Sequence, residues 1–127
     1  MVRVIVAGSR TFDNFSLMEK ELMRYFKKNG LHRADVEIIS GTANGADKLG
    51  EHFAEKYGLK LSKFPADWDK HGKSAGYIRN DEMAKYAIED DNKGVLFAFW
   101  NNVSKGTKNM IDLAKKYKLD ITIVSFD

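Results

Sequence analysis

Short apolar runs alternate with amphipathic stretches along the whole chain of 127 residues. Residues 2–7 and 94–100 are nearly continuous apolar runs, as expected of parallel strands that are covered on both faces. Between such runs, apolar residues recur at the three- and four-residue spacing of a helix. Strands that alternate with helices in this way form parallel sheets. The alternation therefore predicts an α/β fold, a single three-layer α/β/α domain over residues 1–127 with a mainly parallel sheet.

The individual elements follow from the same periodicity. Strands are predicted at 2–7, 36–39, 59–64, 94–100 and 121–124. Apolar stripes predict helices at 15–26, 49–57, 75–88 and 110–117. Residues 66–75 are predicted to form a long loop, and a long loop in a compact domain is often functional.

Three loops rich in glycine, serine and threonine follow predicted strands, at residues 8–11, 40–47 and 104–107. In an open parallel sheet, ligands bind outside the carboxyl ends of the strands, where these loops meet. A glycine-rich turn that leads into a helix brings backbone N–H groups and the positive end of the helix dipole to one point. The three loops together therefore predict a site for a phosphate-bearing ligand at this edge.

Several other kinds of site are disfavoured. The first loop does not have the G-x-G-x-x-G order of a dinucleotide site, and residues 41–48 do not have the G-x-x-x-x-G-K-[ST] order of a P-loop. The chain contains no cysteine, so disulfides and thiolate metal sites are excluded. His71 lies near Asp67 and Asp69, but their spacing matches no metal-ligand motif, so we expect no metal.

Charge and hydropathy restrict the partners and the location. The net charge of +3 comes from basic and acidic residues that are interspersed, so the basic balance alone does not predict a nucleic-acid partner. The chain shows no signal sequence and no apolar run long enough to span a bilayer. We therefore expect a cytoplasmic protein with no membrane partner. Exposed aromatic residues on the first and third predicted helices would permit a homodimer.

Five segments carry a recognisable pattern in order along the chain. These segments are residues 6–12 (VAGSRTF), 40–47 (SGTANGAD), 64–68 (FPADW), 75–80 (AGYIRN) and 104–107 (SKGT). Together they resemble the YspA-type branch of the SLOG superfamily, which also contains the LOG phosphoribohydrolases and the DNA-processing protein DprA. The resemblance covers nearly the whole chain. It implies a Rossmann-like domain that binds nucleotides or nucleotide-derived ligands.

The resemblance to LOG enzymes also bears on catalysis. Those enzymes cleave the base from a nucleoside monophosphate, using an arginine that opens a long helix and a P-G-G-x-G-T-x-x-E loop-helix. Arg79 matches the arginine, but Lys105 replaces a glycine and the glutamate position falls at Met110. Cleavage of an N-glycosidic bond needs a carboxylate near the sugar, and methionine cannot replace it. A reaction of this type would therefore need another carboxylate, from Asp47, Asp67 or Asp69.

The aromatic, acidic and hydroxyl residues have alternative interpretations. Trp68 is expected to cover a base or sugar, whereas Trp100 is expected in the core. Asp47 either orients its own loop or contacts ribose, and the sequence does not separate the two. Ser9, Ser40 and Ser104 are not expected to act as nucleophiles because no histidine base is placed beside them.

The sequence therefore predicts a sensor or sequestering module for a nucleotide or nucleotide-derived ligand, which needs no cofactor. The alternatives are a nucleotide N-glycosidase with a relocated carboxylate and a DprA-like binder of single-stranded DNA. The absence of a continuous basic and aromatic stripe argues against nucleic acid. The predicted ligand-binding residues are Gly8, Ser9, Arg10, Ser40, Gly41, Thr42, Ala43, Gly45, Asp47, Trp68, Arg79, Asn80, Ser104, Lys105, Gly106 and Thr107.

Overall fold

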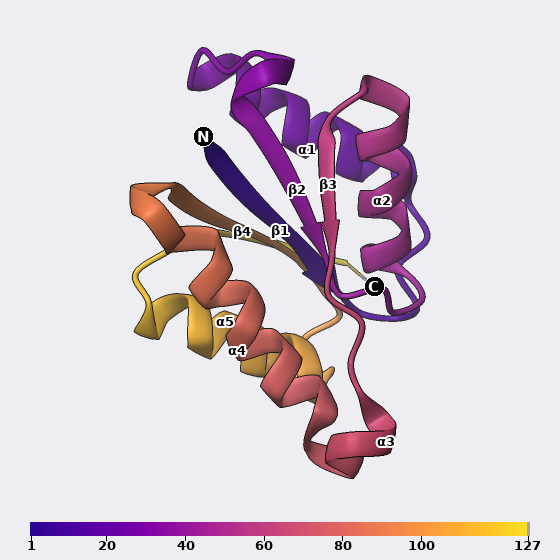
Figure 1. The fold of residues 1–127 in the computed structure, drawn as a ribbon. Coiled ribbons are helices and arrows are strands. Elements are labelled where there is room, and N and C mark those ends of the chain that lie inside the picture. The colour runs from indigo at the N-terminus through magenta and orange to yellow at the C-terminus, as the bar shows by residue number, and fades with distance from the viewer. Residues whose placement is uncertain (127) are drawn as a thin grey trace.

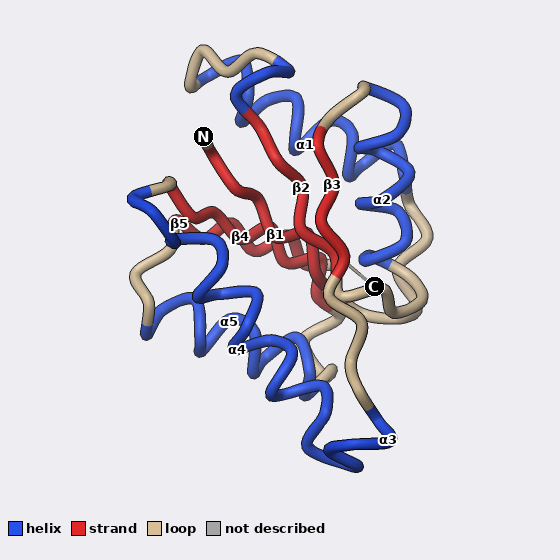
Figure 2. The backbone as a smooth tube through the Cα atoms, viewed as in Figure 1, coloured by secondary structure: helices blue, strands red, loops and turns tan. Residues whose placement is uncertain are grey.

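Five parallel strands form the centre of the protein (Figures 1 and 2). The structure is a computed structural model and describes residues 1–126. The strands lie in the order β3-β2-β1-β4-β5, and each neighbouring pair runs parallel. Their bounds are β1 Val2–Gly8, β2 Val36–Ser40, β3 Lys60–Lys63, β4 Lys93–Trp100 and β5 Asp120–Ser125. The expected Rossmann-like α/β fold with a parallel sheet is confirmed.

Helices cover both faces of the sheet (Figure 1). The helices α1 (Phe15–Lys28) and α2 (Ala46–Tyr57) cover one face, and α4 (Ala75–Ile88) and α5 (Lys105–Lys116) cover the other. A short helix, α3 (Trp68–His71), lies beyond the carboxyl edge of the sheet and leads into α4. None of the helices in residues 1–126 combines the length and the hydrophobicity needed to cross a membrane.

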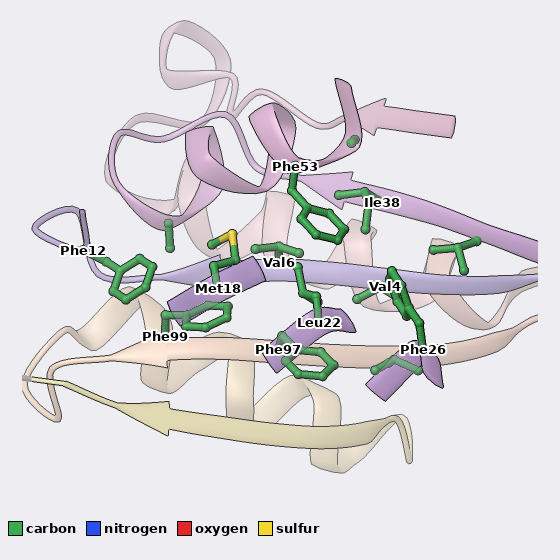
Figure 3. Packing of buried hydrophobic residues seen from close by; sticks show 14 residues of the cluster. Val4, Val6, Phe12, Met18, Leu22, Phe26, Ile38, Phe53, Phe97 and Phe99 are labelled. Atoms are coloured by element: carbon green, nitrogen blue, oxygen red, sulfur yellow. The ribbon is translucent and has the colours of Figure 1, made fainter. Parts of the chain in front are cut away.

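Successive residues of the central strand point to opposite faces, so the sheet has two cores. Val4 and Val6 face α1 and α2, whereas Ile5 and Ala7 face α4 and α5. The first core is rich in aromatic residues (Figure 3). Phe12, in the loop after β1, stacks on a residue of β4 with ring centroids 4.8 Å apart. Burial of this side chain, worth about 2–3 kcal/mol, fixes the first loop close to the end of β4.

Most elements agree with the sequence-based prediction. The helix predicted at 75–88 has these bounds in the structure, and each strand bound differs by at most one residue. The helices α2 and α5 begin three and five residues before the predicted starts. The predicted long loop at 66–75 is wrong, because α3 and a 3-10 turn at Gly72–Ser74 occupy most of it. Asp67 caps the N-terminus of α3, because its Oδ1 accepts a hydrogen bond from the amide of Lys70 at 3.1 Å.

A glutamate is fully buried in β2. Arg3 Nε donates to Glu37 Oε1 at 3.3 Å, and Ser62 Oγ donates to Glu37 Oε2 at 2.6 Å. The hydroxyl of Tyr86 also donates to Oε2, and Lys60 Nζ lies 3.4 Å from Oε1. Burial by itself would raise the pKa of Glu37. The hydrogen bonds and the two cations outweigh burial, so the pKa of Glu37 lies below its usual value.

We expect Glu37→Gln to lower the free energy of unfolding by about 3 kcal/mol at neutral pH, because it leaves buried donors and a cation without their partner. The pKa of Glu37 is lower in the folded than in the unfolded protein. The stabilisation is therefore present above its usual pKa of 4.5 and is lost as the pH falls below it. Urea unfolding at neutral and acidic pH measures both effects. The exposed Glu55→Gln is the matched control, and equal midpoints for the two variants would contradict the role of Glu37.

Candidate functional site

Ser9 joins three segments at the carboxyl edge of the sheet. Its amide donates to the carbonyl of Phe99 at 2.9 Å, and its hydroxyl accepts from the amide of Asn101 at 3.0 Å. Its carbonyl accepts from the amides of Phe12 at 3.1 Å and Ala46 at 3.3 Å. The strand order reverses between β1 and β4, so these bonds lie where ligands bind in open α/β sheets. Ser9 is buried and holds the loops together.

Gly45 makes the contact between the first and second loops. Its φ is +80°, and a Cβ added here would lie 2.5 Å from the carbonyl oxygens of both Ser9 and Arg10. No other residue fits this position without strain. Gly45 therefore brings the start of α2 to the end of β1, and it does not line the cavity described below.

The second loop is held by its own side chains. Ser40 Oγ donates to Glu51 Oε2 at 2.7 Å and accepts from the amide of Thr42 at 3.0 Å. Asp47 Oδ2 accepts from the amide of Ala43 at 3.1 Å. Ser40, like Ser9, therefore takes part in hydrogen bonds that hold the loops.

A cavity of about 210 Å³ lies between these loops, α4 and the start of α5. Ten of the predicted ligand-binding residues line it, and they come from every loop that the sequence analysis singled out. These residues are Gly8, Arg10, Ala43, Asp47, Trp68, Arg79, Asn80, Ser104, Gly106 and Thr107. The convergence that was predicted from separate stretches of chain is therefore present in the fold.

The other predicted residues lie beside the cavity. Ser9, Ser40, Gly41, Thr42, Gly45 and Lys105 are absent from its lining. The cavity also has lining residues that were not predicted to bind a ligand. These residues are Ala7, Lys73, Gly76, Tyr77, Met83 and Met110. Gly76 and Tyr77 lie in the segment 75–80, which carries part of the family resemblance, so they could have been predicted as lining residues from that segment.

Arg79 links the second loop to the end of β3. Its Nη1 donates to the carbonyl oxygens of Gly41 and, at 3.4 Å, of Phe64, and its Nε donates to Asn80 Oδ1 at 3.0 Å. The expectation that Arg79 opens its helix is wrong, because it lies in the second turn of α4. Burial lowers the pKa of Arg79, and the charge of Asp47 opposes this change.

Asp47 places a carboxylate in the cavity wall. Its side chain is buried and lies close to the start of α2. Burial raises the pKa of Asp47 to about 6, although the amide of Ala43 and the charges of Arg79 and Arg10 act in the opposite direction. A carboxylate with this pKa changes its charge close to physiological pH.

The third loop ends in a capped helix. Ser104 caps the N-terminus of α5. Its Oγ accepts hydrogen bonds from the amide of Thr107 at 3.4 Å and from the hydroxyl of Thr107 at 3.1 Å. Asn80 Nδ2 donates to the carbonyl of Gly106 at 3.3 Å, which ties α4 to this first turn. Within residues 1–126, the amides of Lys105 and Gly106 have no hydrogen-bond partner, as is usual in the first turn of a helix.

Two exposed aromatic residues lie at the mouth of the cavity. Trp68 is 53% exposed and Tyr77 is 49% exposed, and both line the cavity. A Cβ added at Gly76 would lie 3.6 Å from the ring of Trp68, so this ring lies over the start of α4. Trp100, as expected, packs against the core, and its Nε1 donates to the carbonyl of Ser104 at 3.1 Å.

We expect Gly41→Ala to destabilise the fold by about 1–3 kcal/mol. The new Cβ would lie 2.7 Å from Arg79 Nη1 and 2.8 Å from Asp47 Oδ2, so the guanidinium would lose its bond to Gly41. Gly106→Ala is the matched control, because nothing lies within 4 Å of its Cβ position. Chemical denaturation compares the two variants, and an equal loss of stability would refute this account of Gly41.

We expect Asp47→Asn to stabilise the ligand-free protein at alkaline pH by an amount of the order of 2 kcal/mol. The folded pKa of about 6 lies above the ordinary value of 3.8, so the stabilisation from protonated Asp47 is lost as the pH rises through 6. The asparagine is neutral throughout and can still accept from Ala43. Urea unfolding across this pH range measures the difference, which should shrink toward acidic pH. The exposed Asp69→Asn serves as control, and a pH-independent difference would contradict the prediction.

Two proteins with curated descriptions are similar to this chain. The Gene 61 protein of Mycobacterium phage D29 is 29% identical over 133 residues, which cover 99% of this chain and 97% of that protein. Metacaspase-1 of Plasmodium falciparum (isolate 3D7) is 34% identical over 86 residues, which cover 67% of this chain but 13% of that protein. The second match concerns a small part of a much longer protein, so the name of that protein carries no argument about this chain.

A family model defines the relationship. The model of the YspA, cpYpsA-related SLOG family matches residues 2–71, which contain the first two loops of the cavity and the segment that leads into α3. This match spans more than half of the 127 residues. The remaining walls of the cavity, from α4 and α5, follow the matched region. The chain belongs to the YspA, cpYpsA-related SLOG family.

Proposed function

We propose that this protein binds a nucleotide or nucleotide-derived phosphorylated ligand in the cavity at the carboxyl edge of the sheet, and acts as a sensor or sequestering module. The observation that carries the proposal is the meeting of three cations, Arg10, Lys73 and Arg79, with the first turn of α5 on one cavity. The side chains of Arg10 and Lys73 are exposed and make no ion pair within the described residues. Both are therefore available to an anion.

The start of α5 is the part of the cavity that suits a phosphate. The amide of Gly106, which lines the cavity, has no hydrogen-bond partner within residues 1–126, and the helix dipole adds a partial positive charge at this point. Arg10 contributes a full charge from the opposite loop. A charged donor strengthens the hydrogen bonds that backbone amides make to phosphate oxygens.

The mouth of the cavity suits a base. Trp68 and Tyr77 offer flat apolar surfaces that are about half exposed, and stacking of a base on an aromatic side chain is worth about 1–3 kcal/mol. Asp47 and Arg79, which also line the cavity, would be available to the sugar. The presence of all these groups on one cavity supports a nucleotide over inorganic phosphate.

Binding without turnover is supported by the chemistry of the cavity wall. Met110, at the position of the LOG glutamate, lines the cavity and is 1% exposed. A methionine cannot stabilise a cationic sugar or activate water. A nucleotide N-glycosidase is the second candidate, favoured by the single fact that Asp47 lines the cavity. Asp67 and Asp69 are absent from the lining.

We expect Arg10→Gln to weaken binding of a nucleoside monophosphate at least tenfold, about 1.4 kcal/mol, without lowering the melting temperature of the ligand-free protein. Arg10 is suited to this test because Arg79 also holds Gly41 and Phe64. A thermal-shift comparison of ribonucleoside monophosphates selects the ligand, and calorimetry measures its affinity. Lys20→Gln, an equal charge change on an exposed residue of α1, is the control.

Four outcomes would overturn or redirect the proposal. Equal losses of affinity in both variants, or no binding of any nucleotide at millimolar concentration, would overturn it. Release of free base on incubation with nucleoside monophosphates would favour the N-glycosidase. Oligonucleotide binding with a steep salt dependence would favour the DprA-like alternative.

A further inference from the structure

The two carboxylate oxygens of Asp47 have different surroundings. Oδ2 accepts a hydrogen bond from the amide of Ala43 at 3.1 Å, whereas Oδ1 has no hydrogen-bond partner within residues 1–126. The residue is only 6% exposed. In the described part of the chain, every completely buried side-chain nitrogen or oxygen has a partner. Oδ1 therefore keeps some contact with solvent, and Asp47 is one of the residues that line the cavity.

A free donor lies on the same wall. Three contacts occupy Nη1 and Nε of Arg79, and Nη2 has no partner within the described residues. Nη2 lies 3.9 Å from the Cβ position of Gly76, which also lines the cavity. The side chains of Arg79 and Asp47 converge on Gly41, since its Cβ position is 2.7 Å from Nη1 and 2.8 Å from Oδ2. The two side chains that carry an unused acceptor and an unused donor therefore both lie beside Gly41 and line the same cavity.

The chemistry of this pair restricts what can lie against it. At neutral pH, Asp47 is mainly ionised, since burial raises its pKa only to about 6. An ionised carboxylate accepts hydrogen bonds and repels phosphate, so the phosphate of the ligand cannot lie at Oδ1. An amine would satisfy Asp47 but not Arg79. A hydroxyl satisfies both, because it donates to the carboxylate and accepts from the guanidinium.

We propose that Asp47 and Arg79 together bind a ribose hydroxyl of a phosphorylated ligand, and that Asp47 makes the site selective for the sugar that carries this hydroxyl over the deoxy sugar that lacks it. The inference rests on the proposed function, because it needs a phosphate held at the start of α5. Asp47 then has two roles, one for each oxygen. Oδ2 orients the second loop through Ala43, and Oδ1 accepts a hydrogen bond from the sugar hydroxyl. The ligand class is then a ribonucleotide or a ribose phosphate.

The test compares ligands that differ by one hydroxyl. Calorimetry is carried out with a ribonucleoside 5′-monophosphate, its 2′-deoxy and 3′-deoxy analogues, and ribose 5-phosphate. We expect at least one deoxy analogue to bind about ten- to one-hundredfold more weakly than the ribonucleotide, since a hydrogen bond to a charged group is lost. Retained affinity for ribose 5-phosphate would identify a sugar phosphate as sufficient, whereas its loss would show that the base is also required.

A variant then assigns the discrimination to Asp47. In Asp47→Asn, the amide oxygen can still accept from Ala43, so the loop is kept, but the charged acceptor is removed. We expect the ratio of ribo to deoxy affinity to fall at least about fivefold, even if all affinities rise because a negative charge is lost. Asp69→Asn, an exposed carboxylate outside the lining, should keep the wild-type ratio. A purely structural role of Asp47 would change all ligands by the same factor.

The outcomes separate this inference from the proposed function. If ribo and deoxy ligands bind equally, or if Asp47→Asn keeps the wild-type ratio, the hydroxyl contact is refuted while nucleotide binding stands. If none of the four compounds binds, the proposed function itself fails and the inference falls with it. Loss of the discrimination in Asp69→Asn as well would also overturn the assignment to Asp47.

Discussion

The arrangement of the site depends on the hydrogen bonds of Ser9. Its backbone and side chain bind the ends of β1 and β4 and the start of α2 to one another. These segments are far apart in the sequence, and Gly45 is the residue whose lack of a side chain allows their approach. Because parallel strands present all their carboxyl ends at one edge, a single buried serine can hold several loops in register there. The loops that these bonds hold in place form part of the lining of the cavity.

Much of the fold is readable from the sequence because periodicity and burial agree. The strands at 2–7 and 94–100 are apolar on both faces, and helices do cover both sides of them. The helix at 75–88 has apolar residues at helical spacing that form one of the two cores. The edge at which the loops meet follows from the parallel order alone. These features depend on the apolar periodicity of many residues, so a single residue that departs from the pattern does not change the prediction.

The remaining features depend on individual contacts. The short helix α3 depends on one cap from Asp67, which is too local for periodicity to reveal. Glutamate is rarely buried without partners, and the partners that bury Glu37 are Arg3, Ser62 and Tyr86, which come from three other elements. Ser9 is predicted as a ligand contact, and the internal hydrogen bonds that it makes to segments distant in the sequence could not be foreseen. Which oxygen of a carboxylate is free can only be known once its neighbours are placed.

The hydrogen bonds within and between the loops also affect the thermodynamics of ligand binding. The loops after β1 and β2 and the start of α5 are tied to neighbouring segments before anything binds. A preorganised receptor loses little conformational entropy on association, so most of the interaction energy would be retained as affinity. The exposed Arg10 and Lys73 would attract anions from a distance and raise the association rate at low ionic strength. The association rate constant would then be high, and the dissociation rate constant would depend on the contacts that the ligand makes with the loops and with the start of α5.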